Sequence, residues 1–221
     1  MATQDFDLLP RWTNGIRVAV AIGGVIGALY VLGIITFGFS PYATDVGYMP
    51  EQPVPYSHAL HAGKLGMDCR YCHNTVEHTA RAAIPPTMTC MGCHANILPD
   101  SARLAPVRES YATGEPVRWV KVHDLPDYAY FNHSAHVNRG VGCATCHGRV
   151  DRMEVVYQVE PLSMSWCLDC HRQPEKYVRP VEEVTNMNYD NELTEDQLVV
   201  GRRIVEEYNL NPSTDCSTCH R

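Results

Sequence analysis

The stretch Cys143-Ala144-Thr145-Cys146-His147 determines how this 221-residue sequence is interpreted. Four other segments share its pattern, in which two cysteines stand three positions apart and a histidine follows the second: Cys69-Arg70-Tyr71-Cys72-His73, Cys90-Met91-Gly92-Cys93-His94, Cys167-Leu168-Asp169-Cys170-His171 and Cys216-Ser217-Thr218-Cys219-His220. The five copies use all ten cysteines of the chain. One repeated chemistry therefore accounts for every thiol.

This spacing is typical of covalent haem attachment. Two thiols three positions apart reach the two vinyl groups on one edge of a porphyrin as thioethers, and the next residue brings an imidazole to the iron. A single Cys-x-x-Cys pair more often binds zinc or performs thiol–disulfide chemistry, but five copies with no cysteine left over favour haem. The sequence predicts five haem c groups attached through the ten cysteines, with these proximal iron ligands: His73, His94, His147, His171 and His220.

A low-spin electron carrier needs a second ligand on each iron. Six histidines remain for that role: His58, His61, His78, His123, His133 and His136. Four of them lie in an internal repeat, because Tyr56–His61 and Phe131–His136 both read aromatic-x-His-x-x-His and precede a motif by similar distances. The arrangement resembles small multihaem cytochromes, in which the first histidine serves the haem just downstream and the second a neighbouring haem. We therefore expect two di-haem modules and a fifth, C-terminal haem.

The same repeat suggests a methionine ligand. With a one-residue slip, Met153 occupies the position after its motif that His78 occupies after the first motif. A His/Met pair would raise the reduction potential of that haem relative to a bis-histidine pair. Core packing of Met153 is the competing interpretation, and Met164 is a rival ligand. His123 is either a ligand or a polar residue anchoring a turn, so seven candidates stand for five places.

Residues 18–39 form a 22-residue stretch without a charged side chain. A helix of this length is about 33 Å long and spans a bilayer core of about 30 Å. We expect a retained anchor rather than a buried core helix or a cleaved signal peptide, because no small-x-small site follows. Arg11 and Arg17 outweigh Asp5 and Asp7 under the positive-inside rule. This predicts residues 1–40 as a cytoplasmic N-terminus with the anchor, and residues 41–221 as an extracytoplasmic, periplasmic haem domain in the bacterial inner membrane.

The domain from 41 to 221 offers about 36 residues per haem (181/5), too few to bury five macrocycles separately. We predict a mostly helical and irregular fold with little sheet, with long loops over 41–55 and 98–126. One amphipathic helix is expected, with Thr194 as its N-cap, Glu195 and Asp196 in its first turn and Tyr208 near its end. The 25 acidic and 18 basic side chains give a net charge of −7, which makes nucleic acid a poor candidate partner.

The apolar stretch, the five motifs, the run Trp119–His136 and the segment Cys167–Arg172 together resemble the pentahaem cytochrome c subunit of bacterial alternative complex III, over essentially the whole chain. The resemblance implies an electron-transfer subunit that is not an enzyme on its own. It implies electrons arriving from an iron–sulfur, molybdopterin-like subunit beside polytopic quinol-binding subunits, and leaving towards a monohaem cytochrome c or a terminal oxidase. In related quinone reductase complexes the electrons run the opposite way.

Two alternatives come from other classes. A membrane-anchored quinol dehydrogenase of the tetrahaem type would oxidise quinol itself, but that family usually carries four haems and the segment Tyr56–His61 points away from it. An extracellular metal-reducing cytochrome fits poorly with a retained anchor. The chain shows no phosphate-binding glycine loop and no nucleophile triad, so electron transfer is the favoured function.

Overall fold

A computed structural model describes Pro10 and residues 12–221, so that Asp5, Asp7 and Arg11 of the predicted orientation signal lie outside the described residues. The chain divides into two compact units, one ending at Asp45 and one comprising Val46–Arg221. The two units are described separately below.

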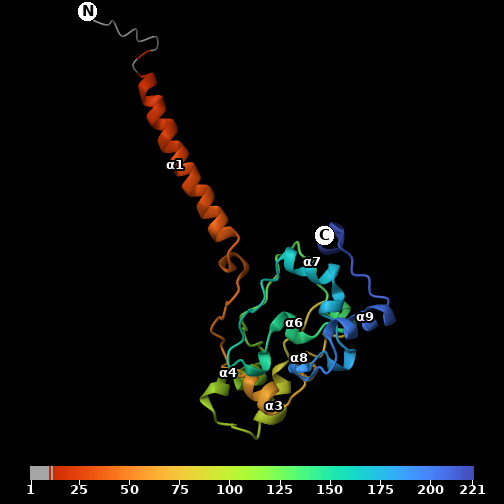
Figure 1. Cartoon of the computed structure of the whole chain (residues 1–221). Coiled ribbons are helices and arrows are strands. Elements are labelled where there is room, and N and C mark those ends of the chain that lie inside the picture. Colours follow the sequence, from red (N-terminus) through yellow and green to blue (C-terminus); the bar gives the residue numbers. More distant parts are fainter. Residues whose placement is uncertain (1–9, 11) are drawn as a thin grey trace, which may run out of the picture. The chain divides into compact units, whose positions relative to one another are not determined.

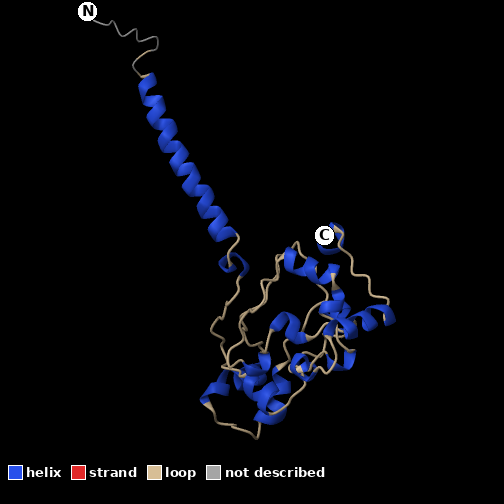
Figure 2. Ribbon diagram, in the orientation of Figure 1, coloured by secondary structure: helices blue, strands red, loops and turns tan. Residues whose placement is uncertain are grey.

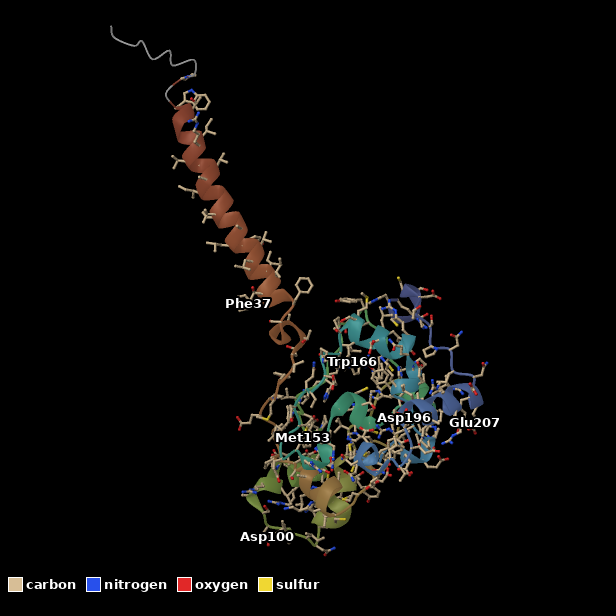
Figure 3. All side chains as sticks on the ribbon, in the orientation of Figure 1. Phe37, Asp100, Met153, Trp166, Asp196 and Glu207 are labelled. Atoms are coloured by element: carbon tan, nitrogen blue, oxygen red, sulfur yellow. The ribbon has the colours of Figure 1, made fainter. Side chains whose placement is uncertain are left out.

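The first unit is one long helix, α1, which runs from Thr13 to Gly38 (Figure 1). It begins five residues before the predicted start at residue 18, because the polar first turn is also helical and the Thr13 hydroxyl donates to the Pro10 carbonyl at 2.7 Å. Its apolar side chains project outward, as at Phe37 in Figure 3. Residues Gly15–Gly38 are long and apolar enough to cross a membrane. A 3₁₀ turn, η1 (Pro41–Thr44), follows.

The second unit is built from short helices joined by irregular segments (Figure 2). The helices are α2 (Cys69–Cys72), α3 (Thr87–His94), α4 (Ala105–Thr113), α5 (His133–Val137), α6 (Cys143–His147), α7 (Met164–Arg172), α8 (Tyr189–Glu192), α9 (Gln197–Glu207) and α10 (Cys216–Cys219). Single turns of π- or 3₁₀-helix complete them: η2 (Ala59–Lys64), η3 (Ala102–Leu104), η4 (Val150–Arg152), η5 (Pro174–Lys176) and η6 (Val181–Glu183). No strand occurs among the described residues, which contain two isolated β-bridges, Ala129 with His220 and Val141 with Val178.

Helix α4 corrects the prediction of a long loop over 98–126. A proline stands in its first turn, where the missing N–H costs nothing, and Gly114 ends it in the left-handed region at φ 78°. The helix packs against α3, one of the motif helices. The sequence did not indicate α4 because the hydrophobic periodicity of this segment is weak. Only Val107 and Ser110 of α4 are buried.

Helix α9 corrects a second prediction, the N-cap at Thr194. The cap is Asp196, whose carboxylate accepts a hydrogen bond from the Leu198 N–H at 2.8 Å. Glu195 lies before the helix and pairs with Arg203 at 3.1 Å. The helix therefore begins two residues later than predicted, because the Asp196 side chain reaches the free amide directly.

The apolar core of this unit is small. A cluster of Val178, Val200 and Ile204 holds α9 against η5, with five partly buried apolar side chains around it. Including this cluster, the described residues bury nine apolar side chains: Val54, Val107, Val137, Met153, Val178, Val184, Tyr189, Val200 and Ile204. Packing between polypeptide side chains alone therefore contributes little to this fold.

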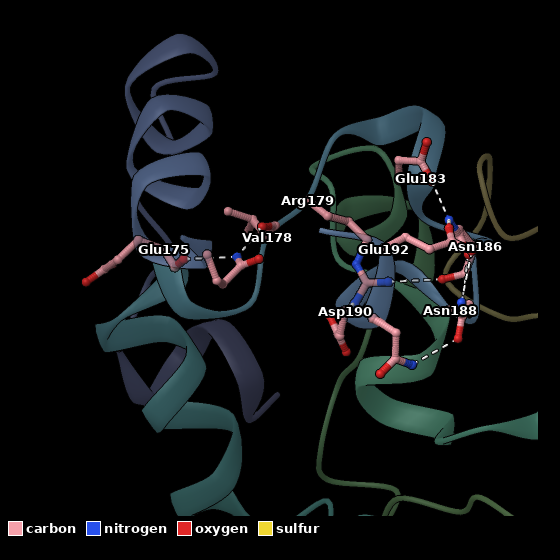
Figure 4. A network of polar contacts seen from close by, with 10 residues as sticks. Glu175, Val178, Arg179, Glu183, Asn186, Asn188, Asp190 and Glu192 are labelled. Atoms are coloured by element: carbon pink, nitrogen blue, oxygen red, sulfur yellow. Dashed lines mark hydrogen bonds and ion pairs between the residues drawn. The ribbon is translucent and has the colours of Figure 1, made fainter. Parts of the chain in front are cut away.

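A buried arginine supplements the core next to α6 (Figure 4). Arg179 is 4% exposed, lies over the Tyr189 ring at 4.5 Å and donates to the Asn186 carbonyl at 3.2 Å. A Cβ added at Gly142 would lie 2.5 Å from the guanidinium, so a larger residue immediately before Cys143 would require the Arg179 side chain to shift.

Candidate cofactor sites

Each Cys-x-x-Cys-His motif lies on a short helix, namely α2, α3, α6, α7 and α10. One helical turn places the two thiols of a motif on the same side, with the histidine at the end of the helix. Local capping favours these turns: the Asp68 carboxylate accepts from the Arg70 N–H at 2.8 Å, and the Ser163 hydroxyl accepts from the Trp166 N–H at 3.4 Å. All ten cysteines are unpaired by disulfides. The helical spacing and the unpaired thiols are compatible with covalent haem attachment.

Three of the motif histidines each lie near a second imidazole ring. The ring centroids lie 6.2 Å apart in His61–His94, 6.5 Å in His133–His147 and 6.1 Å in His136–His171. Two imidazoles on opposite faces of one metal ion, with metal–nitrogen bonds of about 2 Å, have centroids roughly 6 Å apart. These spacings fit one iron between each pair.

A fourth pair follows from the repeat. His58, the counterpart of His133, lies close enough to His73 to interact with it electrostatically. Burial, followed by the neighbouring His73 and His61, lowers the pKa of His58 to about 4. Burial likewise lowers the pKa of His147 to about 3. Both rings are therefore neutral near pH 7, the form in which imidazole binds a metal.

Backbone carbonyls hold most of these rings through their Nδ1 atoms. Such contacts are seven in number: His61 to Ser57 O at 2.8 Å, His73 to Ala83 O at 2.9 Å, His94 to Ile97 O at 2.9 Å, His133 to Ala80 O at 2.9 Å, His136 to Asn132 O at 2.7 Å, His171 to Ser213 O at 2.6 Å and His220 to Tyr128 O at 3.2 Å. A protonated Nδ1 that donates to a carbonyl leaves Nε2 as the free lone pair. The polypeptide thus selects the tautomer that an iron requires.

The aromatic residue of each His-x-x-His repeat orients both of its histidines. Tyr56 stacks on His61 at 4.4 Å and meets His58 edge-on at 4.8 Å. Phe131 does the same with His136 at 4.4 Å and His133 at 4.8 Å. The sequence revealed these aromatics as part of the repeat but not their role. The sequence could not reveal the carbonyl acceptors, because the backbone of any residue can supply one.

The remaining candidate ligands do not show the ring spacing of these pairs. His78 is exposed. His123 meets the His147 ring edge-on at 4.4 Å, and its buried Nε2 has no hydrogen-bond partner. Met153 is 6% exposed. The ring neighbour of His220 is Tyr128, at 5.9 Å.

The backbone register revises the argument for Met153. The carbonyl of Met153 accepts from the Ala59 N–H at 3.0 Å, and the carbonyl of Thr79 accepts from the Ser134 N–H at 3.2 Å. Ala59 and Ser134 are equivalent, since each follows the first histidine of its repeat. Met153 therefore corresponds to Thr79 without a slip, and not to His78. A methionine ligand at Met153 stays a prediction that no longer rests on the repeat.

Comparison with known proteins agrees with this chemistry. Residues 129–221, which contain the last three motifs, match the family described as cytochrome c7 and related cytochrome c. The chain is also 33% identical over 133 residues to the multihaem cytochrome c subunit of menaquinone reductase from Nitratidesulfovibrio vulgaris. That match covers 58% of this chain and 60% of the relative. The C-terminal part of the chain therefore resembles a family of haem-binding cytochromes c, and the chain is related to a multihaem cytochrome c subunit.

Proposed function

We propose that the chain is the electron-relay subunit of a membrane-bound quinol-oxidising complex, and that it holds five haem c groups. Each bound haem supplies a centre that accepts and releases one electron. The observation that carries the proposal is the spacing of 6.1 to 6.5 Å between facing imidazoles from separate segments of the chain. Two imidazoles on one iron leave no free position for a substrate, which favours relay over catalysis.

The proposed ligand pairs follow the geometry. They are His73 with His58, His94 with His61, His147 with His133, and His171 with His136. His220 is the proximal ligand of the fifth haem, and His78, His123 and Met153 are the candidates left for its second ligand or for other roles. The Nδ1 contacts hold each ring in place, so an electron can arrive and leave with little rearrangement of the ligands.

We further propose that α1 anchors the chain in the bacterial inner membrane, with its N-terminus in the cytoplasm and the second unit on the periplasmic side. The length and apolar surface of α1 support the anchor. Arg17, close to the start of α1, supports the orientation. Attachment of haem c in bacteria takes place outside the cytoplasm, and this agrees with the same orientation.

The partners proposed are those of alternative complex III: an iron–sulfur, molybdopterin-like subunit, polytopic quinol-binding subunits and a monohaem cytochrome c that leads to a terminal oxidase. The relative from N. vulgaris is named as a subunit of a menaquinone reductase. A quinone-linked complex is common to both, whereas the direction of electron flow differs between them.

Affinity purification of the tagged full-length chain from its native membrane tests this proposal. We expect an iron–sulfur subunit and multi-helix membrane subunits to co-purify, and quinol to reduce the haems only in that complex. The chain separated from its partners should not be reduced by quinol. Steady quinol oxidation by the isolated chain would instead support the tetrahaem-type dehydrogenase, and the relay proposal would be rejected.

A further inference from the structure

We infer that the five motifs stand in one unbranched file whose spatial order differs from their order in the sequence. The file runs Cys90–His94, Cys69–His73, Cys143–His147, Cys167–His171, Cys216–His220. This inference rests on the proposed function and adds the order in which electrons pass from haem to haem. Each of the four junctions has its own structural support.

The first junction joins the two motifs of the first module. Tyr56 contacts both His58 and His61, whose facing partners belong to α2 and α3 respectively. The thiols of Cys72 and Cys90 also lie close enough to interact electrostatically. One short segment therefore couples the motif Cys69–His73 to the motif Cys90–His94.

The second junction joins the modules through their first motifs. The Cys69 and Cys143 side chains lie close enough to interact electrostatically. Around them the contacts are reciprocal: Ala59 N–H donates to the Met153 carbonyl, and its counterpart Ser134 donates to Thr79.

A second reciprocal pair supports this junction. Gly63 lies so close to the Asp151 carbonyl that an added Cβ would be 2.1 Å from its oxygen. The equivalent Asn138 donates its side-chain amide to the Glu77 carbonyl at 2.8 Å. The histidine segment of each module thus docks on the segment that follows the first motif of the other module. This pseudo-twofold arrangement places the two first motifs together and the second motifs outward.

The third and fourth junctions extend the file. Phe131 contacts His133 and His136, whose facing partners are His147 and His171. The Cys146 thiol interacts with those of the motif Cys167–His171. The His171 ring then donates to the Ser213 carbonyl at 2.6 Å, three residues before the last motif, and Cys167 interacts with Cys219.

The two ends of the file are its accessible points. Cys93 and Cys216 are the exposed cysteines, and they belong to the first and last motifs of the file. In Figure 1, α3 lies at one end of the second unit, α6 lies near its middle, and α7 and the C-terminus lie at the other end. An electron donor and an acceptor therefore dock at opposite ends, one near α3 and one near α10.

Single-haem removal in the full-length chain tests this order. The pairs Cys90→Ala with Cys93→Ala, and Cys69→Ala with Cys72→Ala, each remove one attachment site. The equivalent variants of the other motifs assign each signal in redox-monitored NMR of the haem methyl groups. In the inferred file, removing the α3 haem shifts the reduction potential of one neighbour, and removing the α2 haem shifts those of two.

Sequence order predicts the reverse, with two neighbours affected at α3 and one at α2, and that result would overturn the inference. Because an attachment variant can fail to fold, His94→Met and His73→Met provide a second pair that keeps the thioethers and changes one potential. His94→Met should shift the reduction potential of one neighbouring haem, and His73→Met should shift those of two. A wild-type chain with fewer than five haems would count against the proposed function, whereas five haems coupled in sequence order would count against the file alone.

Discussion

At the scale of single residues, the chain controls imidazole chemistry mainly through its backbone. Seven ring Nδ1 atoms are held by carbonyls, and burial keeps His58 and His147 neutral by lowering their pKa values to about 4 and 3. Carbonyl acceptors leave no trace in the sequence, so the ligand candidates were predictable while the groups that orient them were not. The aromatic-x-His-x-x-His repeat, by contrast, is visible in the sequence and identified these ligand candidates.

His136→Ala should convert one low-spin haem to the high-spin state, because the His136 ring faces His171 at 6.1 Å. The haem itself should stay attached through its thioethers. EPR spectra together with a haemochrome assay measure both quantities. The control is Thr194→Ala, which changes an exposed residue that is not a ligand candidate and should leave the spectrum unchanged. An unchanged spectrum in His136→Ala would contradict the proposed pair.

We predict that the Asp68 carboxylate stabilises the folded chain in a pH-dependent way. Hydrogen bonds from Arg70 and then Thr185 lower the pKa of this carboxyl to about 2. A lowered pKa means that the carboxylate stabilises the folded state above its ordinary pKa of about 4, and that this contribution is lost as the pH falls towards 2. Asp68→Asn should therefore destabilise the chain at pH 7, and its difference from wild type in denaturant unfolding should shrink towards pH 2. A constant difference would contradict the assignment.

At the scale of elements, the sequence predicts what local chemistry dictates and misses what distant contacts decide. The long helix α1 follows from the uninterrupted apolar stretch 18–39, which is a local property of the sequence. The π-turn at His61, helix α4 and the register that matches Met153 with Thr79 depend on segments far apart in the chain. The predicted start of α9 failed for a smaller reason, because Thr194 and Asp196 are both good caps and only the structure shows which one meets the free amide.

Asp196→Ala should lower the free energy of unfolding by about 1 kcal/mol, because it removes the side-chain acceptor for the Leu198 N–H. Thr194→Ala should have a much smaller effect, since Thr194 makes no such cap. Denaturant unfolding of the two variants gives the comparison. Equal losses would contradict Asp196 as the cap of α9.

At the scale of the whole molecule, the small core explains why the motifs are so dense. Nine buried apolar side chains are few for the second unit, and we expect covalently attached haems with their ligands to supply the rest of its stabilisation. The sequence leads to the same expectation through its small number of residues per predicted haem. What it could not predict is the order of the motifs in space, which the reciprocal contacts between the modules determine.

The second unit should not fold without haem attachment. The full-length chain produced in cells that lack the haem-attachment machinery should show circular dichroism from α1 in detergent and little further helix. It should also be digested rapidly by protease beyond Asp45. Material from competent cells is the control. A protease-resistant second unit without haem would show that the polypeptide core suffices.

The most direct test of the account is the number of haems bound covalently to each chain, measured by pyridine haemochrome absorbance and intact mass on the same preparation. We predict five, with no free thiol and no disulfide left. A smaller number, or a mass that matches zinc or disulfide-paired cysteines, would contradict the assignment of every thiol to a haem.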